Sequence, residues 1–388
     1  MRRLIRRFRR KLIPASNELS VCEADIWRMP RGSHTIALRT YCALQRYKLD
    51  APLLAAGLLT KDKASRIFGI TGGKLMKIID SHIHLCQSLN GFGARGELRC
   101  IGGGYVEYAD GSSFRMFPEE LGEDNVTPEA VIALMDKEGV EKAVMLQGNF
   151  IGPQNLYTWE AMRKYPERFT GAACYDPFCR KYEDVRRHLF EELGFPIVKF
   201  EVSDGSGLMS YHRDFPLDGE MMEEQLCYAE ALELTVVFDI GRRGGCCWQA
   251  QRLAAAVKRH PKLQFVVCHL LAPQGRSYEE EWREAVRALN LENVVFDLAS
   301  LSSNQKPETY PYPTAVWFIR EALSILGADR MMWGSDLPSN LCRDTYRNLF
   351  GYILESDALT EKEKESILWK TADRIYFSDS HNHKNVIK

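Results

Sequence analysis

Short apolar runs alternate with helical stretches eight times between residues 76 and 377. The apolar runs are rich in β-branched residues, which is typical of buried parallel strands. Eight strand-plus-helix units in about 300 residues match the size of a (β/α)8 barrel better than that of an open sheet. We therefore predict an α/β fold that resembles a TIM barrel. The expected strands are 77–84, 142–148, 170–177, 196–203, 235–241, 263–273, 293–300 and 330–338.

One insertion interrupts this pattern between the first strand and its helix, at residues 98–120. Apolar and polar residues alternate on both sides of Asp110 and Gly111, a pair that favours a tight turn between antiparallel strands. We therefore predict a hairpin insertion after strand 1. Loops that follow barrel strands lie at one end of the barrel, so this hairpin is expected over its mouth and brings Arg115 there as a candidate substrate-binding residue.

The first 75 residues differ in charge from the rest of the chain. They hold 16 Lys or Arg against 5 Asp or Glu, whereas the whole chain has a net charge of −1. Three interpretations stay open: a disordered basic arm, a segment for nucleic acid, anionic lipid or targeting, and a stretch that is not natively translated because Met76 is the start. We predict three parts, which are a basic N-terminal extension (1–75), a (β/α)8 barrel (76–377) and a polar tail (378–388).

Composition places the chain among ordinary globular proteins. Hydrophobic residues make up 45% of it, and its apolar runs fall short of the roughly 20 residues that cross a bilayer. Eleven cysteines show no repeated spacing, which favours a reducing cytoplasm over a disulfide framework. We expect a cytoplasmic protein with a small-molecule substrate, no nucleic-acid partner and no membrane span. A homo-oligomer is compatible with the sequence.

Polar residues gather at the carboxyl ends of the expected strands. His82 and His84 are two apart in an extended segment and therefore share a face, and Asp239, His269 and Asp336 end strands five, six and eight. In a (β/α)8 barrel such positions face one pocket. A single buried histidine or helix-capping aspartate is common, but five together form a donor set for a divalent ion, which takes three or four ligands from different elements.

The sequence resembles a known family at several places. They are the paired histidines of "IDSHIH", the segment "MDKEGVEKAVMLQG", the phrase "RKYPERFTGAACYDP", the "CHL" of strand six, "WGSDLP" on strand eight and the closing "LTEKEKESILWKTADRIY". Together these resemble the amidohydrolase-2 branch of the amidohydrolase superfamily, which includes the aminocarboxymuconate-semialdehyde decarboxylase-like enzymes. The resemblance covers about residues 76–377. It implies one divalent metal ion, Zn or Mn, as the cofactor.

The resemblance also implies roles for individual residues. His82, His84 and Asp336 would surround the ion, and His269 would act on the substrate or orient the bound water. Members of this branch usually place a metal-binding histidine at the end of strand five, where this chain has Asp239. As a ligand, Asp239 would make the site formally neutral and favour hard metals such as Mn over Zn. Alternatively, it would hold the ion through water.

Two further positions leave alternatives open. Lys199 and Glu201 share a face of strand four, where Lys199 could be carboxylated into a bridging ligand, Glu201 could supply the missing ligand, or the two could form a structural ion pair. Arg242 and Arg243 directly follow strand five. They suit a carboxylate or phosphate group of a substrate, although an exposed loop pair fits equally well.

Three functions are compatible with these residues. We favour a metal-dependent hydrolase of a small, carboxylated amide, ester or lactone, with Asp336 as the base and His269 polarising the carbonyl. The first alternative is a metal-dependent decarboxylase of an aromatic or unsaturated carboxylic acid. The second is a barrel that no longer binds metal and serves as a binding protein.

Overall fold

A computed structural model describes residues 70–71 and 74–378. The predictions for the basic extension 1–75 and the polar tail 378–388 therefore lie almost wholly outside the described residues. Two short strands, β1 (Ile70–Thr71) and β2 (Lys74–Leu75), form an antiparallel pair. From Lys77 onward the described chain forms one compact unit.

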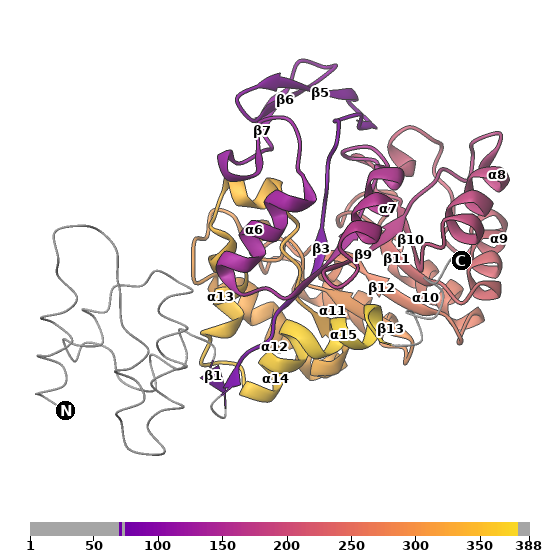
Figure 1. Cartoon of the computed structure of the whole chain (residues 1–388). Helices are drawn as coiled ribbons and strands as arrows, with labels where there is room; N and C mark the ends of the chain where they lie inside the picture. The colour runs from indigo at the N-terminus through magenta and orange to yellow at the C-terminus, as the bar shows by residue number, and fades with distance from the viewer. Residues whose placement is uncertain (1–69, 72–73, 379–388) are drawn as a thin grey trace, which may run out of the picture. The chain divides into compact units, whose positions relative to one another are not determined.

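The described part of this unit contains eight parallel strands in sequence order, which confirms the predicted (β/α)8 barrel (Figure 1). A bridge between Ile83 and Leu337 joins the chain after the last strand to the first strand, at the barrel seam. The strands are β3 (Ile79–Ile83), β8 (Lys142–Leu146), β9 (Phe169–Ala173), β10 (Ile197–Glu201), β11 (Thr235–Asp239), β12 (Gln264–Val267), β13 (Val294–Asp297) and β14 (Met331–Met332).

Inward-facing side chains change from apolar to polar along the strands. Ile197 and Val237 belong to a buried cluster inside the barrel, which also contains Ile375 of the C-terminal helix α15 (Thr371–Tyr376). Residues two apart in a strand share a face, so the next inward positions of the same two strands are Lys199 and Asp239. Burial of the apolar half stabilises the barrel, and the polar half is left for chemistry at the carboxyl end.

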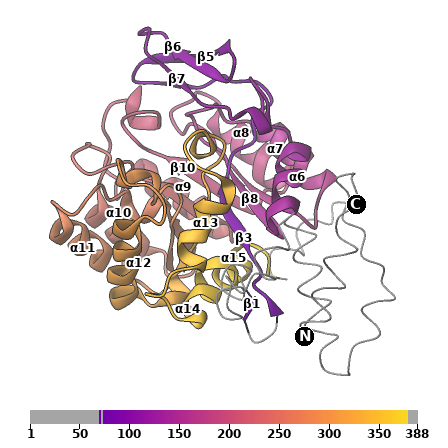
Figure 2. The same cartoon turned by 90° about the vertical axis from the view of Figure 1, so that its left-hand side faces the viewer.

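Helices surround the strands on the outside, as Figures 1 and 2 show. Helix α6 begins where its residue types predict, since Thr127 accepts a hydrogen bond from Ala130 N and Pro128 is the first helical residue. Gly139 ends the helix with φ of 77°. Within residues 74–378, none of the helices has the length and hydropathy that a bilayer crossing requires. Besides α15, the helices of six or more residues are α6 (Pro128–Glu138), α7 (Asn155–Lys164), α8 (Tyr182–Arg187), α9 (Glu220–Ala231), α10 (Ala250–Arg259), α11 (Glu279–Ala288), α12 (Pro313–Leu326) and α13 (Tyr346–Leu354).

The insertion after the first strand forms a small antiparallel sheet, not a hairpin alone. The expected hairpin is present as β6 (Tyr105–Tyr108) and β7 (Ser113–Arg115), and β5 (Gly96–Gly102) and β4 (Phe92–Gly93) extend it. Its base is hydrogen-bonded to loops that follow β8 and β10, through Phe92 N to Asn149 O and Ala94 N to Gly205 O. The insertion therefore lies at the carboxyl end of the barrel, as Figure 2 also shows.

The sixth strand is shorter than the sequence predicts. It ends at Val267, and His269, Leu270, Leu271 and Ala272 all have positive φ angles between 49° and 64°. Such angles cost roughly 1–2 kcal/mol per residue for side chains other than glycine. The chain therefore leaves the sheet in a left-handed turn that carries His269.

Candidate metal centre

Three donor side chains from the two ends of the barrel sequence meet at the carboxyl end of the strands. Asp336 Oδ1 lies 2.9 Å from Nε2 of His84 and 3.8 Å from Nε2 of His82. All three residues offer a donor atom within 4.8 Å of the others. This spacing suits a single ion, because bonds of about 2.0–2.2 Å place neighbouring ligand atoms roughly 3–4 Å apart.

Backbone hydrogen bonds across the barrel seam hold these residues in register. Asp336 N donates to His82 O at 2.8 Å, and His84 N donates to Leu337 O at 3.0 Å. Buried Asp80 adds side-chain bonds, since its Oδ1 accepts from His82 N at 3.2 Å and Ser335 N at 2.8 Å. Burial raises the pKa of the Asp80 carboxyl to about 7. Asp80 therefore ties the first strand to the loop after the last.

Asp297, at the end of β13, orients the ring of His82. Its Oδ2 lies 3.0 Å from His82 Nδ1, and its Oδ1 accepts hydrogen bonds from His269 N at 2.8 Å and Ala299 N at 3.0 Å. Burial favours the neutral form of Asp297, but the hydrogen bond with His82 and the charge of His269 hold its pKa below the usual value. An ionised carboxylate only accepts hydrogen bonds, so His82 Nδ1 carries the proton and Nε2 presents a lone pair to the site.

The remaining electrostatics keep both histidines neutral and Asp336 ionised. Burial lowers the pKa of His82, and it lowers the pKa of His84 to about 4. Burial alone would raise the pKa of Asp336, yet the hydrogen bond with His84 and the charge of His269 hold it well below the usual range. Among the described residues His84 Nδ1 has no hydrogen-bond partner although it is buried. Two neutral imidazoles and one carboxylate form a donor set that a divalent ion accepts.

His269 stacks beside the donor set. Its ring lies 5.1 Å from that of His82, centre to centre, and its Nδ1 is bonded to Ala299 O at 2.9 Å. Nε2 lies 3.4 Å from Asp239 Oδ2. Burial opposes a charge on His269, but the Asp239 carboxylate raises the pKa of the imidazole to about 10. His269 is therefore an imidazolium that can donate a proton or a hydrogen bond.

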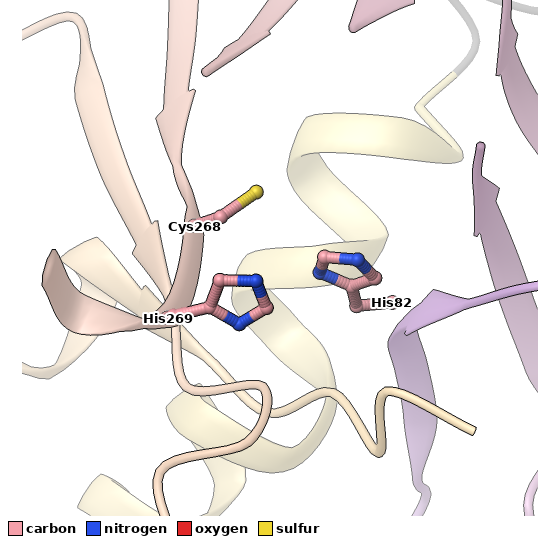
Figure 3. A group of neighbouring side chains, drawn as sticks. All are labelled: His82, Cys268 and His269. Atoms are coloured by element: carbon pink, nitrogen blue, oxygen red, sulfur yellow. The ribbon is translucent and has the colours of Figure 1, made fainter. Parts of the chain in front are cut away.

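Figure 3 shows that a buried thiol lies next to these rings. Cys268, together with His82 and His269, forms a second group of donor atoms that lie within 4.8 Å of one another. Burial raises the pKa of this thiol well above its usual value, so the thiol is protonated at neutral pH. It packs in the barrel core cluster and contributes little to an ion site in this form.

The polar residues of strands four and five form a second layer beside the donor set. Lys199 Nζ lies 3.4 Å from His82 Nε2 and donates to Leu146 O at 3.2 Å. Burial disfavours the ammonium, but Glu201 and Asp239 are among the groups that keep the pKa of Lys199 raised. Burial also raises the pKa of Glu201 to about 7. In the described structure, neither Glu201 nor Asp239 joins the donor group of His82, His84 and Asp336, and their roles as ligands stay predictions.

The predicted substrate-binding arginines lie on the loops around the barrel mouth. Arg242 and Arg243 line a cavity of about 230 Å³ between the loops after β11 and β12. Arg243 forms an ion pair with Glu281, whereas Arg115 is exposed at the end of β7. Burial and the charges of Arg343 and Arg242 lower the pKa of Lys306. These loops therefore bring several cations together.

Sequence reasoning missed Asp297, which makes more contacts with the site than Asp239 does. The segment "VVFDLAS" contains Asp297 and "VVFDIGR" contains Asp239, so the two aspartates end β13 and β11, the strands on either side of β12, in nearly the same local sequence. The rule that placed Asp239 at the barrel mouth also places Asp297 there. What the local sequence does not contain is the contact with His82, which lies 215 residues away.

Solved structures of other proteins share this fold. A probable 2-pyrone-4,6-dicarboxylic acid hydrolase from Acinetobacter baumannii, with citric acid bound, is 16% identical with a TM-score of 0.56, and the match covers 77% of this chain and 99% of that one. An amidohydrolase from Burkholderia multivorans, with bound HEPES in one crystal form and zinc in another, is 17% identical with a TM-score of 0.57, covering 77% and 98%. At these identities the likeness shows the fold.

Sequence comparison places the chain in a family. No curated protein matches it by sequence. The family model described as amidohydrolase, however, matches residues 79–377, which span all eight barrel strands and the candidate site. This match confirms the resemblance noted in the sequence. The chain belongs to the amidohydrolase family and is an enzyme.

Proposed function

We propose that the protein is a hydrolase that depends on one divalent metal ion and acts on a small substrate with carboxylate groups. The convergence of His82, His84 and Asp336 at the carboxyl end of the barrel carries this proposal. The lone pair that Asp297 leaves on His82 Nε2 and the contact of His84 Nε2 with Asp336 Oδ1 support the proposal that these residues fit an ion. His82, His84 and Asp336 would hold it, with Asp239 and Glu201 as further candidate ligands.

The residues around this centre support hydrolysis of an amide, ester or lactone. A bound divalent ion lowers the pKa of water towards neutrality and polarises a carbonyl group. Asp336 is ionised and accepts the proton of the attacking water, and its contact with the Ser300 hydroxyl keeps one oxygen oriented. His269, charged through Asp239, donates to the carbonyl oxygen or to the leaving group.

The cations at the barrel mouth support an anionic substrate. Lys306 and Arg343 line one cavity, and the charges of Arg343 and Arg242 help to lower the pKa of Lys306, although the three residues follow different strands. Burial raises the pKa of the Cys342 thiol, and the charges of Arg115 and Arg343 both oppose that rise. Arginine binds carboxylates through two parallel hydrogen bonds. Four cations on four loops suit a substrate with two or more carboxylates.

A decarboxylase acting on similar acids is the second candidate. The observation that favours it is the imidazolium of His269, because loss of carbon dioxide leaves a carbanion that must be protonated. Membership of an enzyme family argues against the third interpretation, a metal-free binding protein.

Metal analysis with kinetics tests the proposal. The double variant His82→Ala, His84→Ala should contain one equivalent of metal less than wild type and lose activity, whereas His188→Ala, at an exposed histidine paired with Glu192, should change neither. A panel of carboxylated lactones, esters and amides, followed for ring or bond opening and for carbon dioxide release, separates the two candidates. Full metal content in the double variant would contradict the proposed metal centre.

A further inference from the structure

A second group of donor side chains lies outside the barrel, between α9 and the end of α10. Glu223 and Cys227 are one helical turn apart on α9, and His260 directly follows α10. Glu223 Oε1 lies 3.3 Å from His260 Nε2 and 4.0 Å from Cys227 Sγ. The three donor atoms all lie within 4.8 Å of one another.

His260 is held with one nitrogen directed at this group. Its side chain is only 3% exposed, and its Nδ1 lies 2.7 Å from Glu230 Oε2. The other nitrogen, Nε2, is buried and makes no hydrogen bond within the described part of the chain; its contact is the 3.3 Å ion pair with Glu223 Oε1. Metal-binding histidines generally have a carboxylate on the second ring nitrogen, which fixes the ring and leaves a lone pair on the first. Glu230 occupies that position.

The carboxylate of Glu223 is also oriented. Arg259 Nε donates to Glu223 Oε2 at 2.7 Å, so Oε1 is the oxygen that faces His260 and Cys227. Burial, together with the carboxylates of Glu223 and Glu230, raises the pKa of the Cys227 thiol. The thiol therefore stays protonated until a metal cation replaces the proton on the sulfur.

We propose that Glu223, Cys227 and His260 bind a zinc ion. Tetrahedral zinc with bonds of about 2.0–2.3 Å needs ligand atoms roughly 3.4–3.6 Å apart, within a few tenths of an ångström of the two distances found here. When zinc binds, the Sγ–H proton leaves to solvent. The thiolate and the two glutamates then balance the charges of zinc and Arg259. Cys227 is exposed, so the ion has access and water completes the coordination.

This site is separate from the candidate metal centre. His260 and Glu230 come just before β12 and β11, at the amino end of the barrel, where residues of such barrels serve stability and not catalysis. The ion would join α9, which lies in the outer layer of helices in Figure 1, to the end of α10. It should therefore stabilise the fold and leave turnover unchanged.

Cobalt(II) tests the proposal on the full chain after treatment with a chelator. Thiolate-bound cobalt absorbs in the near ultraviolet, whereas His and Asp ligands give no such band, so the spectrum identifies this site beside the barrel centre. Wild type loaded with two equivalents of cobalt should show the band, and zinc should displace it. Cys227→Ser should lose the band and keep its activity.

Two variants serve as controls. Cys179→Ser removes another exposed thiol, and Cys268→Ser removes the thiol beside His82. Both should keep the band. Glu230→Gln should weaken zinc binding about tenfold, because outer carboxylates contribute 10- to 100-fold to affinity. Absence of the band in wild type, its survival in Cys227→Ser, or its loss in Cys268→Ser alone would overturn the proposal.

Discussion

The substitution Asp297→Asn tests how the barrel prepares His82 for a metal ion. Both backbone hydrogen bonds of Asp297 end on Oδ1, and an asparagine keeps that oxygen. Its amide nitrogen then replaces Oδ2 and faces His82 Nδ1 as a donor. His82 must then carry its proton on Nε2, so Nε2 no longer has a free lone pair with which to bind the ion.

The expected loss of metal affinity follows from the hydrogen bond between Asp297 and His82 that the substitution replaces. A hydrogen bond to a charged group contributes about 1.5–3 kcal/mol, and about 1.4 kcal/mol corresponds to a factor of ten in affinity. Metal affinity should therefore fall about 10- to 100-fold, while the free energy of unfolding of the metal-free protein changes by no more than about 2 kcal/mol. Titration with Mn(II) measures the barrel centre selectively, because the thiolate group on α9 favours softer ions.

Asp80→Asn is the matched control. It removes another fully buried carboxylate from the neighbourhood of His82, but Asp80 contacts the backbone of that residue and the Tyr346 hydroxyl, not the ring. The Tyr346 hydroxyl can accept from the new amide. Mn(II) affinity in this variant should stay within about threefold of wild type, less than 1 kcal/mol. Equal affinities in Asp297→Asn and wild type would refute the reasoning about the tautomer.

Four further predictions concern the pH dependence, the role of Asp239 as a ligand, the turn and the N-terminal part. In metal-free protein, the raised pKa of His269 contributes stability below pH 6.5 that disappears as the pH rises towards about 10; urea titrations should show this decline, and Asp239→Asn should remove most of it. The same variant should weaken Mn(II) binding if Asp239 is a ligand, and unchanged affinity would exclude it. Ala272→Gly should raise the free energy of unfolding by about 0.5–1 kcal/mol, because Ala272 has φ of 49°, and equal or lower stability would count against strain in the turn. A chain that starts at Met76 should fold and keep its activity, and an insoluble or inactive product would move the domain boundary.

The sequence predicts the barrel more completely than it predicts the contacts within the site. Strand order and the polar strand ends follow from a pattern that recurs eight times, so His82, His84 and Asp336 could be placed at one pocket from sequence. The partner of each aspartate could not be predicted, because Asp239 and Asp297 have nearly the same local sequence yet contact the rings of different histidines. These contacts depend on the stagger of the strands around the barrel, which no local pattern contains.

The left-handed turn after β12 was beyond sequence reasoning for another reason. "CHLLAP" contains no glycine, and its apolar residues favour a continued strand. Hydrogen bonds to residues far away in the sequence favour the turn instead. His269 N donates to the Asp297 carboxylate, and His269 Nδ1 is hydrogen-bonded to Ala299 O. Tertiary contacts thus override the local preference at the residue that we propose as an acid, which is where strained backbone tends to occur.

The barrel seam has a consequence for how the protein matures. The proposed ligands His82 and His84 lie on the first strand and Asp336 follows the last, and the bonds that join them are the seam bonds themselves. A chain still on the ribosome would thus possess two histidines for most of its synthesis and gain the third ligand only when the eighth strand emerges. Metal loading would then follow barrel closure, and cellular ions would be captured mainly by completed chains.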